Sequence, residues 1–367
     1  MTGPWCGADG ATLRPDTPHT LTDGTRRWPV VDDVAWLRAG DDDLRERAVA
    51  ELDRGDVDGA AALLFADADE WWDQRAPSNA RLRRVRHTRT LREAVDLLGL
   101  GRVGTYFLHR WSDPTWLATL ALTAAHPPAG RPVVDIACGA GHLLRHLAQH
   151  GHDDLLGVDV VFAKLWLARR HLVPRRVRLV CADAQAAWPD PAGGPRYVCC
   201  HDALYFLEHK AAVLTAARRH AGGQGAVVVG HGHNALHPAG RSGRPLPGPQ
   251  WADLLPGSRA YTEEELTAAA LDGRLPRVAE PAELAGTEAV GLVDDPAGAP
   301  GETRLLYPPP HARLRPNPLY TGPLRHWPGD AWAAEYGERA AAYLPALWTA
   351  YEDPVRRRML VDIPETW

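Results

Sequence analysis

The stretch Arg131-Pro-Val-Val-Asp-Ile-Ala-Cys-Gly-Ala-Gly-His142 decides the fold of this chain. Its two valines are apolar and β-branched, which predicts a buried strand that Asp135 closes at its carboxyl end. Gly139 and Gly141 follow, and residues without a Cβ let the backbone pass close to a ligand at the start of a helix. The stretch therefore predicts a strand, a glycine turn and a helix in direct succession.

Two further short apolar runs that end in a carboxylate follow, Leu155–Asp159 and Val177–Asp183, each after a segment with a helical pattern. Strands and helices that alternate along a chain predict a parallel, doubly wound α/β sheet. Ligands of such sheets bind outside the carboxyl ends of the strands. Each Asp alone could merely cap the next helix, but three acids at the same place in three strands favour a ligand site.

With these motifs in this order, the region from about Pro114 to Asp295 resembles the class I S-adenosylmethionine-dependent methyltransferases. The resemblance implies a Rossmann-like, seven-stranded sheet and S-adenosyl-L-methionine as cofactor. It also implies that the first turn binds the methionine part, the second acid binds the ribose hydroxyls, and an Asp before a small residue meets the adenine. The implied cofactor-binding residues are Asp135, Ala137, Gly139, Gly141, Asp159, Val160, Asp183 and Ala184. Ala137 replaces the first glycine of the common pattern with another small residue.

Tyr106 and Arg110 lie on the helical segment before the first of these strands. Such a segment covers the cofactor in many members of the family, so both are expected to bind the methionine carboxylate. Packing of an aromatic helix onto the sheet is the alternative. A pyridine dinucleotide is a weaker choice of cofactor, because Leu144 stands where that fingerprint has its third glycine.

Histidine and aspartate gather after the fourth and fifth predicted strands, Arg196–Cys200 and Gly225–Gly230. These strands are neighbours in the class I sheet, so the residues that follow them are expected on one rim, facing the sulfonium. Imidazoles that titrate near neutrality, and a carboxylate beside them, can take a proton from an attacking nitrogen or oxygen. The expected catalytic residues are His201, Asp202 and His231, and the expected substrate contacts are Tyr205, His233 and Asn234.

The same side chains could instead bind a metal ion, as in O-methyltransferases that chelate catechols. We expect the rings of His231 and His233 to point to opposite faces of their strand, which leaves at most one of them at the site. No metal ligands are therefore assigned from the sequence.

The chain has 367 residues, more than one methyltransferase core needs, so further elements must flank the core. The N-terminal stretch resembles a degenerate version of the small zinc-ribbon domain that accompanies some methyltransferases. Of its metal cysteines only Cys6 could remain, and one thiolate cannot hold a tetrahedral zinc site. A small β-cap without metal is therefore expected at the N-terminus.

Helical patterns and turn residues complete the predicted domain organisation. The expected parts are the zinc-ribbon-like cap 1–40, a mainly helical region 41–113, the methyltransferase domain 114–300 and a C-terminal extension 301–367. Within the third part, a Pro- and Gly-rich insertion at about 236–256 is expected to act as a substrate lid. The helices expected outside the core are Leu44–Leu52, Ala60–Trp72, Leu91–Leu98, one that Ser112 or Asp113 caps, and Ala331–Tyr351 with a break near Pro345.

The composition limits the classes of molecule that the protein is expected to bind. A net charge of −5 and a hydrophobic content of 45% fit an ordinary globular protein with no global attraction to nucleic acid or to an anionic membrane. The first twenty residues lack the charged and apolar regions of a signal peptide. Five cysteines without metal spacing suit a reducing compartment, so a cytoplasmic location is expected.

These features predict a methyltransferase that acts on a small molecule in bacterial secondary metabolism, that is, in natural product biosynthesis. The loop His201–Lys210 differs from the N-P-P-Y-type loops of nucleic-acid amino methyltransferases, which argues against a base-modifying enzyme. One alternative stays open: a protein of this fold that catalyses a cyclisation or elimination with its acid and base residues. Another is a binding role beside a partner protein of the same pathway.

Overall fold

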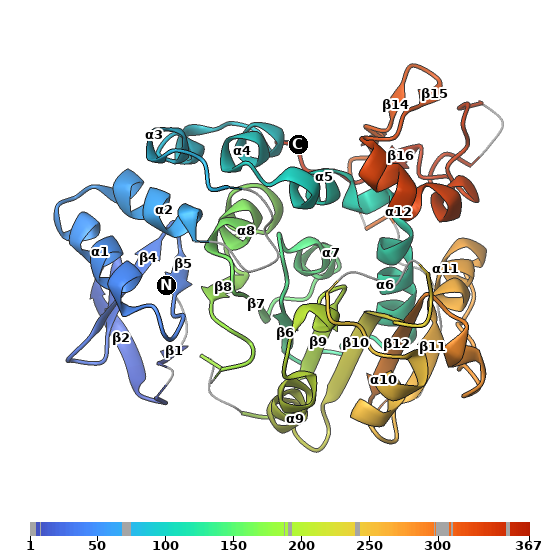
Figure 1. Cartoon of the computed structure of the whole chain (residues 1–367), viewed down its shortest axis with the longest axis horizontal. Coiled ribbons are helices and arrows are strands. Elements are labelled where there is room, and N and C mark those ends of the chain that lie inside the picture. Colours follow the sequence, from blue (N-terminus) through green and yellow to red (C-terminus); the bar gives the residue numbers. More distant parts are fainter. Residues whose placement is uncertain are drawn as a thin grey trace. The chain divides into compact units, whose positions relative to one another are not determined.

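The computed structural model describes residues 5–7, 9–67, 75–186, 188–189, 193–238, 243–296, 298, 308–309, 311–349 and 353–367. The chain divides into two units, each built of helices and strands (Figure 1). Unit 1 comprises Met1–Gly104, Pro132–Gly194 and Thr366–Trp367, and unit 2 comprises Thr105–Arg131 and Pro195–Glu365. The four-part domain organisation expected from the sequence stays a prediction.

Unit 1 contains strands in the order β1-β2-β3-β4-β5-β8-β7-β6. Their bounds are β1 Trp5–Cys6, β2 Thr12–Thr17, β3 Thr20–Thr22, β4 Arg27–Val31, β5 Val34–Trp36, β6 Val133–Ile136, β7 Leu155–Asp159 and β8 Arg178–Cys181. The last three are parallel, as the alternation of strands and helices predicts. β5 pairs in parallel with β8, so the antiparallel N-terminal strands continue the same sheet.

Side-chain caps begin some of the helices of unit 1. Thr90 and Glu93 form a capping box at the start of α4, and Gly99 ends that helix with a φ of 65°. Asp56 caps α2, which therefore begins before the predicted Ala60; it ends at Ala66, and residues 68–72 of that prediction lie outside the described residues. The bounds are α1 Asp42–Asp53, α2 Val57–Ala66, α3 Asn79–Leu82, α4 Leu91–Leu98, α5 Gly101–His109 (which runs on into unit 2), α7 His142–Gln149 and α8 Phe162–Leu167.

Unit 2 contains the strand order β9-β10-β12-β11. Their bounds are β9 Tyr197–His201, β10 Ala226–His233, β11 Arg259–Thr262 and β12 Ala289–Asp294. β9 and β10 are parallel, and β12 is antiparallel to both β10 and β11. The helices are α6 Pro114–Ala125, α9 Lys210–Ala221, α10 Gly248–Leu254, α11 Glu263–Asp272 and α12 Asp330–Ala341.

Helices cover both faces of this part of the sheet (Figure 1). Trp251 of α10 packs on Gly232, whose partner across the strand pair is Val290. The next residue, Gly291, faces Leu122 of α6 and Leu266 of α11. Because successive residues of a strand point to opposite faces, α10 covers one face and α6 with α11 covers the other. This arrangement matches the Rossmann-like α/β class expected from the sequence.

The C-terminal extension differs from its prediction. The C-terminal helix expected over Ala331–Tyr351 with a break near Pro345 is present only in its first part: α12 ends at Ala341, residues 342–349 are not α-helical, and Tyr351 lies outside the described residues. Pro345 explains the early end, because proline disfavours helical geometry in the residues before it. The short strand pairs of this part are β13 Arg315–Pro316 with β16 Leu360–Val361, and β14 Tyr320–Thr321 with β15 Leu324–Arg325.

The lid expected at 236–256 includes residues 239–242, which lie outside the described ones, and contains α10. Its role stays a prediction. Among the described residues, no helix combines the length and the apolar character that crossing a membrane requires.

Asp113, one of the two expected caps, starts α6 from a fully buried position. Its Oδ1 accepts hydrogen bonds from the Trp116 amide at 2.7 Å and from the Thr115 hydroxyl at 2.8 Å. The Arg110 guanidinium donates to the same oxygen at 2.8 Å. One carboxylate therefore both begins the helix and balances a buried cation.

Replacing Asp113 with Ala should lower the free energy of unfolding by about 3–5 kcal/mol, because it leaves the Arg110 charge buried without its partner. Chemical denaturation measures this loss. The matched control is Asp42→Ala in α1, where an exposed Asp likewise pairs with an Arg three residues on. The control should change stability by no more than about 0.5 kcal/mol; equal losses in both variants would contradict the role assigned to Asp113.

Candidate functional site

The glycine turn of unit 1 is fixed by the acid of the next strand. Asp159 Oδ2 accepts a hydrogen bond from the Gly139 amide at 2.9 Å, and its Oδ1 accepts one from the Val161 amide at 2.9 Å. Ala137 and Gly139 have φ angles of 55° and 56°. The turn thus bends through left-handed backbone that is held from β7.

Gly141 is required on two counts. Its φ of 78° lies in the left-handed region, and an added Cβ would lie 3.1 Å from Val173 and 3.2 Å from Ala168. It also stands as the N-cap residue of α7. No side chain at position 141 therefore covers the backbone amides at the start of α7, and uncovered amides at a helix start can bind an anion.

The three predicted acids lie at the ends of neighbouring strands. Ile136 pairs with Val158, and Asp159 pairs with Cys181, so β6, β7 and β8 end at nearly the same level. Asp135 and Asp159 lie within these strands, while Asp183 follows β8 and accepts a hydrogen bond from the Gln185 amide. The structure thus brings together the residues predicted to bind the cofactor in unit 1: Asp135, Ala137, Gly139, Gly141, Asp159, Val160, Asp183 and Ala184.

In unit 2, Asp202 is the centre of a buried polar site, with a side chain that is 6% exposed. The Tyr205 hydroxyl donates to its Oδ1 at 2.8 Å, and the Tyr106 hydroxyl donates to its Oδ2 at 2.9 Å. Burial acts to raise the pKa of Asp202, but the charges of His231 and Arg110 outweigh it and lower that pKa below its ordinary value. Asp202 is therefore an ionised carboxylate at neutral pH.

Tyr106 and Arg110 are engaged with this carboxylate. The Arg110 guanidinium lies 3.3 Å from Asp202 Oδ2 and 4.8 Å from the centre of the Tyr106 ring. The expected contact of both residues with the methionine carboxylate stays a prediction.

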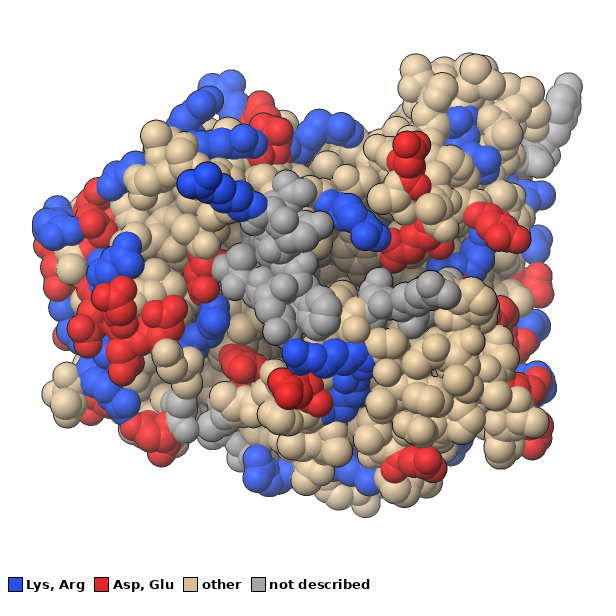
Figure 2. Space-filling model, viewed as in Figure 1, with Lys and Arg blue, Asp and Glu red and all other residues tan. Residues whose placement is uncertain are grey.

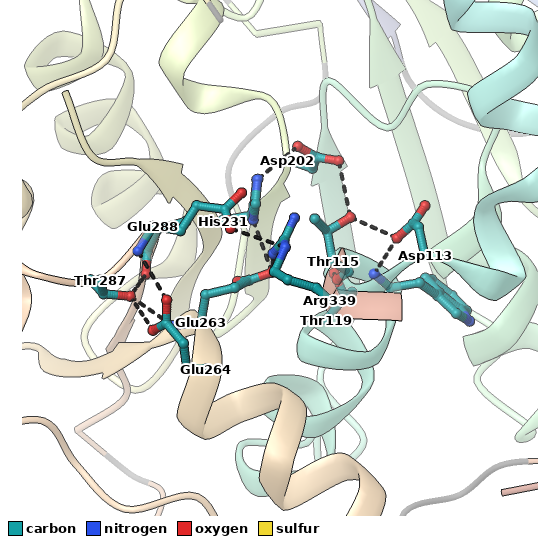
Figure 3. A network of polar contacts seen from close by, with 12 residues as sticks. Asp113, Thr115, Thr119, Asp202, His231, Glu263, Glu264, Thr287, Glu288 and Arg339 are labelled. Carbon is teal, nitrogen blue, oxygen red and sulfur yellow. Dashed lines mark hydrogen bonds and ion pairs between the residues drawn. The ribbon is translucent and has the colours of Figure 1, made fainter. Parts of the chain in front are cut away.

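Asp202 belongs to a chain of charged groups of alternating sign, all buried except the partly exposed Arg339, and Figure 3 shows most of them. The successive members are Asp113, Arg110, Asp202, His231, Glu263, Arg339 and Glu288. His231 lies 3.0 Å from Glu263 through Nδ1 and 3.7 Å from Asp202 through Nε2. We call these seven residues the ion chain. They come from both sheet and helices, so only the folded unit 2 assembles them.

The histidines do not titrate near neutrality, contrary to expectation. Burial acts to lower the pKa of His231, but Glu263 and Asp202 raise it to about 9. Burial lowers the pKa of His201 to about 3, and burial with the charge of His231 lowers that of His233 to about 3. His231 is therefore an imidazolium at neutral pH in this arrangement, and the other two are neutral rings.

His201 does not join the group around Asp202. Its ring lies so close over Gly230 that a Cβ there would fall 2.2 Å from Nδ1. Neither of its ring nitrogens has a hydrogen-bond partner among the described residues. The charges of Arg110 and Asp202 act on the His201 ring, but no hydrogen bond among the described residues links that ring to the ion chain, and its catalytic role stays a prediction.

The expectation that His231 and His233 point to opposite faces is wrong. Side chains two residues apart on an extended strand share a face, and the register shift between Val229 and Gly232 does not separate these two rings. Their centroids are 4.6 Å apart. Asp202, His231 and His233 each offer a ligand atom, and these atoms lie within 4.8 Å of one another. The orientation of the two rings therefore does not exclude a metal ion at Asp202, His231 and His233.

Asn234, a predicted substrate contact, has its side chain committed to the backbone. Its Nδ2 donates to the carbonyls of Ala285 at 3.0 Å and Thr287 at 2.8 Å, and its Oδ1 accepts from the Gly248 amide at 2.8 Å. The side chain thereby joins β10 to α10. This is a structural role, whereas Tyr205 and His233 do lie at the Asp202 site, with ring centroids 4.2 Å apart.

The sequence did not indicate four members of the ion chain as site residues. Asp113 was expected only as a helix cap, and Glu263 lies in the acid-rich first turn of a helical pattern. Glu288 begins the apolar run Glu288–Asp294, which predicts a strand, and Arg339 lies in the helix expected at the C-terminus. Only the position of Glu263 at the start of a predicted helix could have drawn attention to it. An acid there interacts favourably with the helix dipole, but glutamate is rarely buried, and Glu263 is 1% exposed.

Comparison with known proteins agrees with the order of these motifs. Residues 133–225 match the family model described as a methyltransferase domain. No protein of curated function is significantly similar in sequence to this chain.

Solved structures of methyltransferases resemble parts of the chain. An S-adenosylmethionine-dependent methyltransferase of Thermotoga maritima is 17% identical with a TM-score of 0.35, over 51% of this chain and 90% of its own. An amino pentose methyltransferase of Micromonospora echinaspora is 28% identical with a TM-score of 0.26, over 31% of this chain and 48% of its own. A chain from a complex of a Haloferax volcanii methyltransferase with a methyltransferase activator is 16% identical with a TM-score of 0.41, over 56% of this chain and 96% of its own.

All three TM-scores are below 0.5, so none of these proteins informs on the substrate. The matched domain agrees with the motifs of the cofactor turn, which lie within it. The chain therefore contains a methyltransferase domain at residues 133–225, and the enzyme uses S-adenosylmethionine as its cofactor.

Proposed function

We propose that the enzyme methylates a small molecule that binds at Asp202 in unit 2. The observation that carries the proposal is a buried carboxylate that stays ionised and is surrounded by hydroxyl and imidazole groups. Such a carboxylate can accept the hydrogen bond of an O–H or N–H group and so orient the atom that attacks.

The reaction forms one bond and breaks one. A lone pair on the acceptor's oxygen or nitrogen bonds to the methyl carbon while the S–CH3 bond breaks and its electrons stay on sulfur. The products are the methylated acceptor and S-adenosylhomocysteine, and the proton of the acceptor passes to a base. His231 is held as an imidazolium by two carboxylates in this arrangement, so the ionised Asp202 is the better acceptor of that proton.

A small acceptor is favoured over a nucleic acid. Among the described residues, basic and acidic side chains intermingle on the face that Figure 2 shows, whereas a phosphate backbone is bound by clustered basic side chains. The net charge of −5 acts in the same direction. A place in bacterial secondary metabolism and a partner protein from the same pathway remain predictions.

We propose that Asp159 binds the ribose hydroxyls of the cofactor in addition to holding the glycine turn. Asp159→Ala should weaken S-adenosylhomocysteine binding at least tenfold in calorimetry, since each charge-assisted hydrogen bond is worth about 1.5–3 kcal/mol. Asp183→Ala tests the adenine contact in the same way. Unchanged affinity in Asp159→Ala would remove this residue from the cofactor site.

Asp202→Asn should reduce methyl transfer by about 10²–10⁴-fold, the usual contribution of a proton-accepting group. Cofactor affinity should stay nearly unchanged, because the residues predicted to bind the cofactor in unit 1 are untouched. The matched control is His201→Gln, which changes the adjacent residue outside the ion chain and should keep most of the activity. If His201→Gln loses as much turnover as Asp202→Asn while both stay folded, the assignment to Asp202 fails.

A further inference from the structure

We propose that Asp202, His231 and His233 bind a divalent first-row transition metal ion. All three lie where β9 and β10 end, and their ligand atoms converge within 4.8 Å. Two imidazoles and one carboxylate are a ligand set that suits iron, manganese, cobalt or zinc.

The spacing between Asp202 and His231 is the first argument. Asp202 Oδ1 and His231 Nε2 are 3.7 Å apart, too far for a hydrogen bond. Two atoms that each lie about 2.1 Å from one metal ion are roughly 3–4 Å apart. The distance therefore fits two ligands of one ion better than a direct contact.

Neighbouring side chains hold two of the proposed ligands in place, which is a second reason for the proposal. A histidine that binds a metal through one nitrogen usually presents the other to a carboxylate or a carbonyl, which fixes the orientation of the ring. His231 does so, since its Nδ1 lies 3.0 Å from Glu263, whose side chain is 1% exposed. The hydroxyls of Tyr106 and Tyr205 hold the carboxylate of Asp202 in the same manner.

Backbone geometry is the third argument. Asp202 and His231 both have a φ of 56°, in the left-handed region that residues other than glycine seldom adopt. Backbone of this kind costs free energy and gathers at functional sites. Here the two left-handed residues are also two of the three proposed ligands.

Charge is the fourth argument. Apart from His231, the ion chain contains four acidic side chains and two guanidinium groups, so acidic groups outnumber basic ones around the proposed ligands. A divalent cation bound at Asp202 and His231 would add positive charge among these acids. Three protein ligands leave coordination positions open, and, on the proposed function, the acceptor's oxygen or nitrogen would take one of them, with Asp202 then acting as a metal ligand and not as the proton acceptor.

Cobalt titration tests the site in the whole protein after treatment with a chelator. Co²⁺ should bind one ion per chain, with visible absorption bands and a calorimetric isotherm, and Mn²⁺ or Zn²⁺ should compete. His233→Gln should weaken binding at least tenfold, and Glu263→Gln about 10–100-fold, the usual effect of losing an orienting partner. His201→Gln is the matched control and should bind cobalt as the wild type does.

No saturable binding of Co²⁺, Mn²⁺ or Zn²⁺ would overturn the proposal, and so would binding that His233→Gln leaves unchanged. Circular dichroism and the melting temperature show whether each variant is folded. If His233→Gln does not fold, Glu263→Gln and His201→Gln decide, and equal affinities in these two would also overturn the site. S-adenosylhomocysteine binding and methyl transfer are measured separately, so a failed metal site and a failed methyltransferase reaction can be told apart.

Discussion

The need to compensate a buried carboxylate shapes unit 2 more than any other constraint. An ionised Asp202 removed from water must have partners within a few ångströms, because burial of an isolated charge costs several kcal/mol. Arg110 and His231 supply these partners, and each then requires an anion of its own. Asp113 and Glu263 provide the next charges, so one buried acid leads to an alternating chain.

The same constraint explains why the C-terminal region belongs to unit 2. Arg339 of α12 lies 3.0 Å from Glu288 and 3.7 Å from Glu263, so this helix closes the ion chain at its far end. Without it, Glu288 would lose its ion pair with Arg339, and Glu263 would keep its ion pair with His231 but lose the one with Arg339. An extension that first appears to be packing alone thus carries part of the site's electrostatics.

Local patterns in the sequence suffice for the sheet and the cofactor turn. Asp135 and Asp159 each end a short apolar run, and parallel pairing places such ends side by side. Glu263 and Arg339 could not be assigned in this way, because tertiary packing alone brings them to His231 across long stretches of chain. His231 and His233 were expected on opposite faces, but residues two apart on a strand share a face, and their rings lie 4.6 Å apart.

The cost of the ion chain is itself evidence of function. Apolar side chains of similar volume often stabilise a core as well as a buried ion network does, or better. A site that keeps seven ionisable groups, together with left-handed backbone at Asp202 and His231, gives up stability that simple packing would retain. In unit 1, by contrast, Asp159 serves the fold and the proposed cofactor contact with the same two oxygens. Stability and function coincide at the cofactor turn and oppose one another at Asp202, which is where the reactive chemistry should be sought.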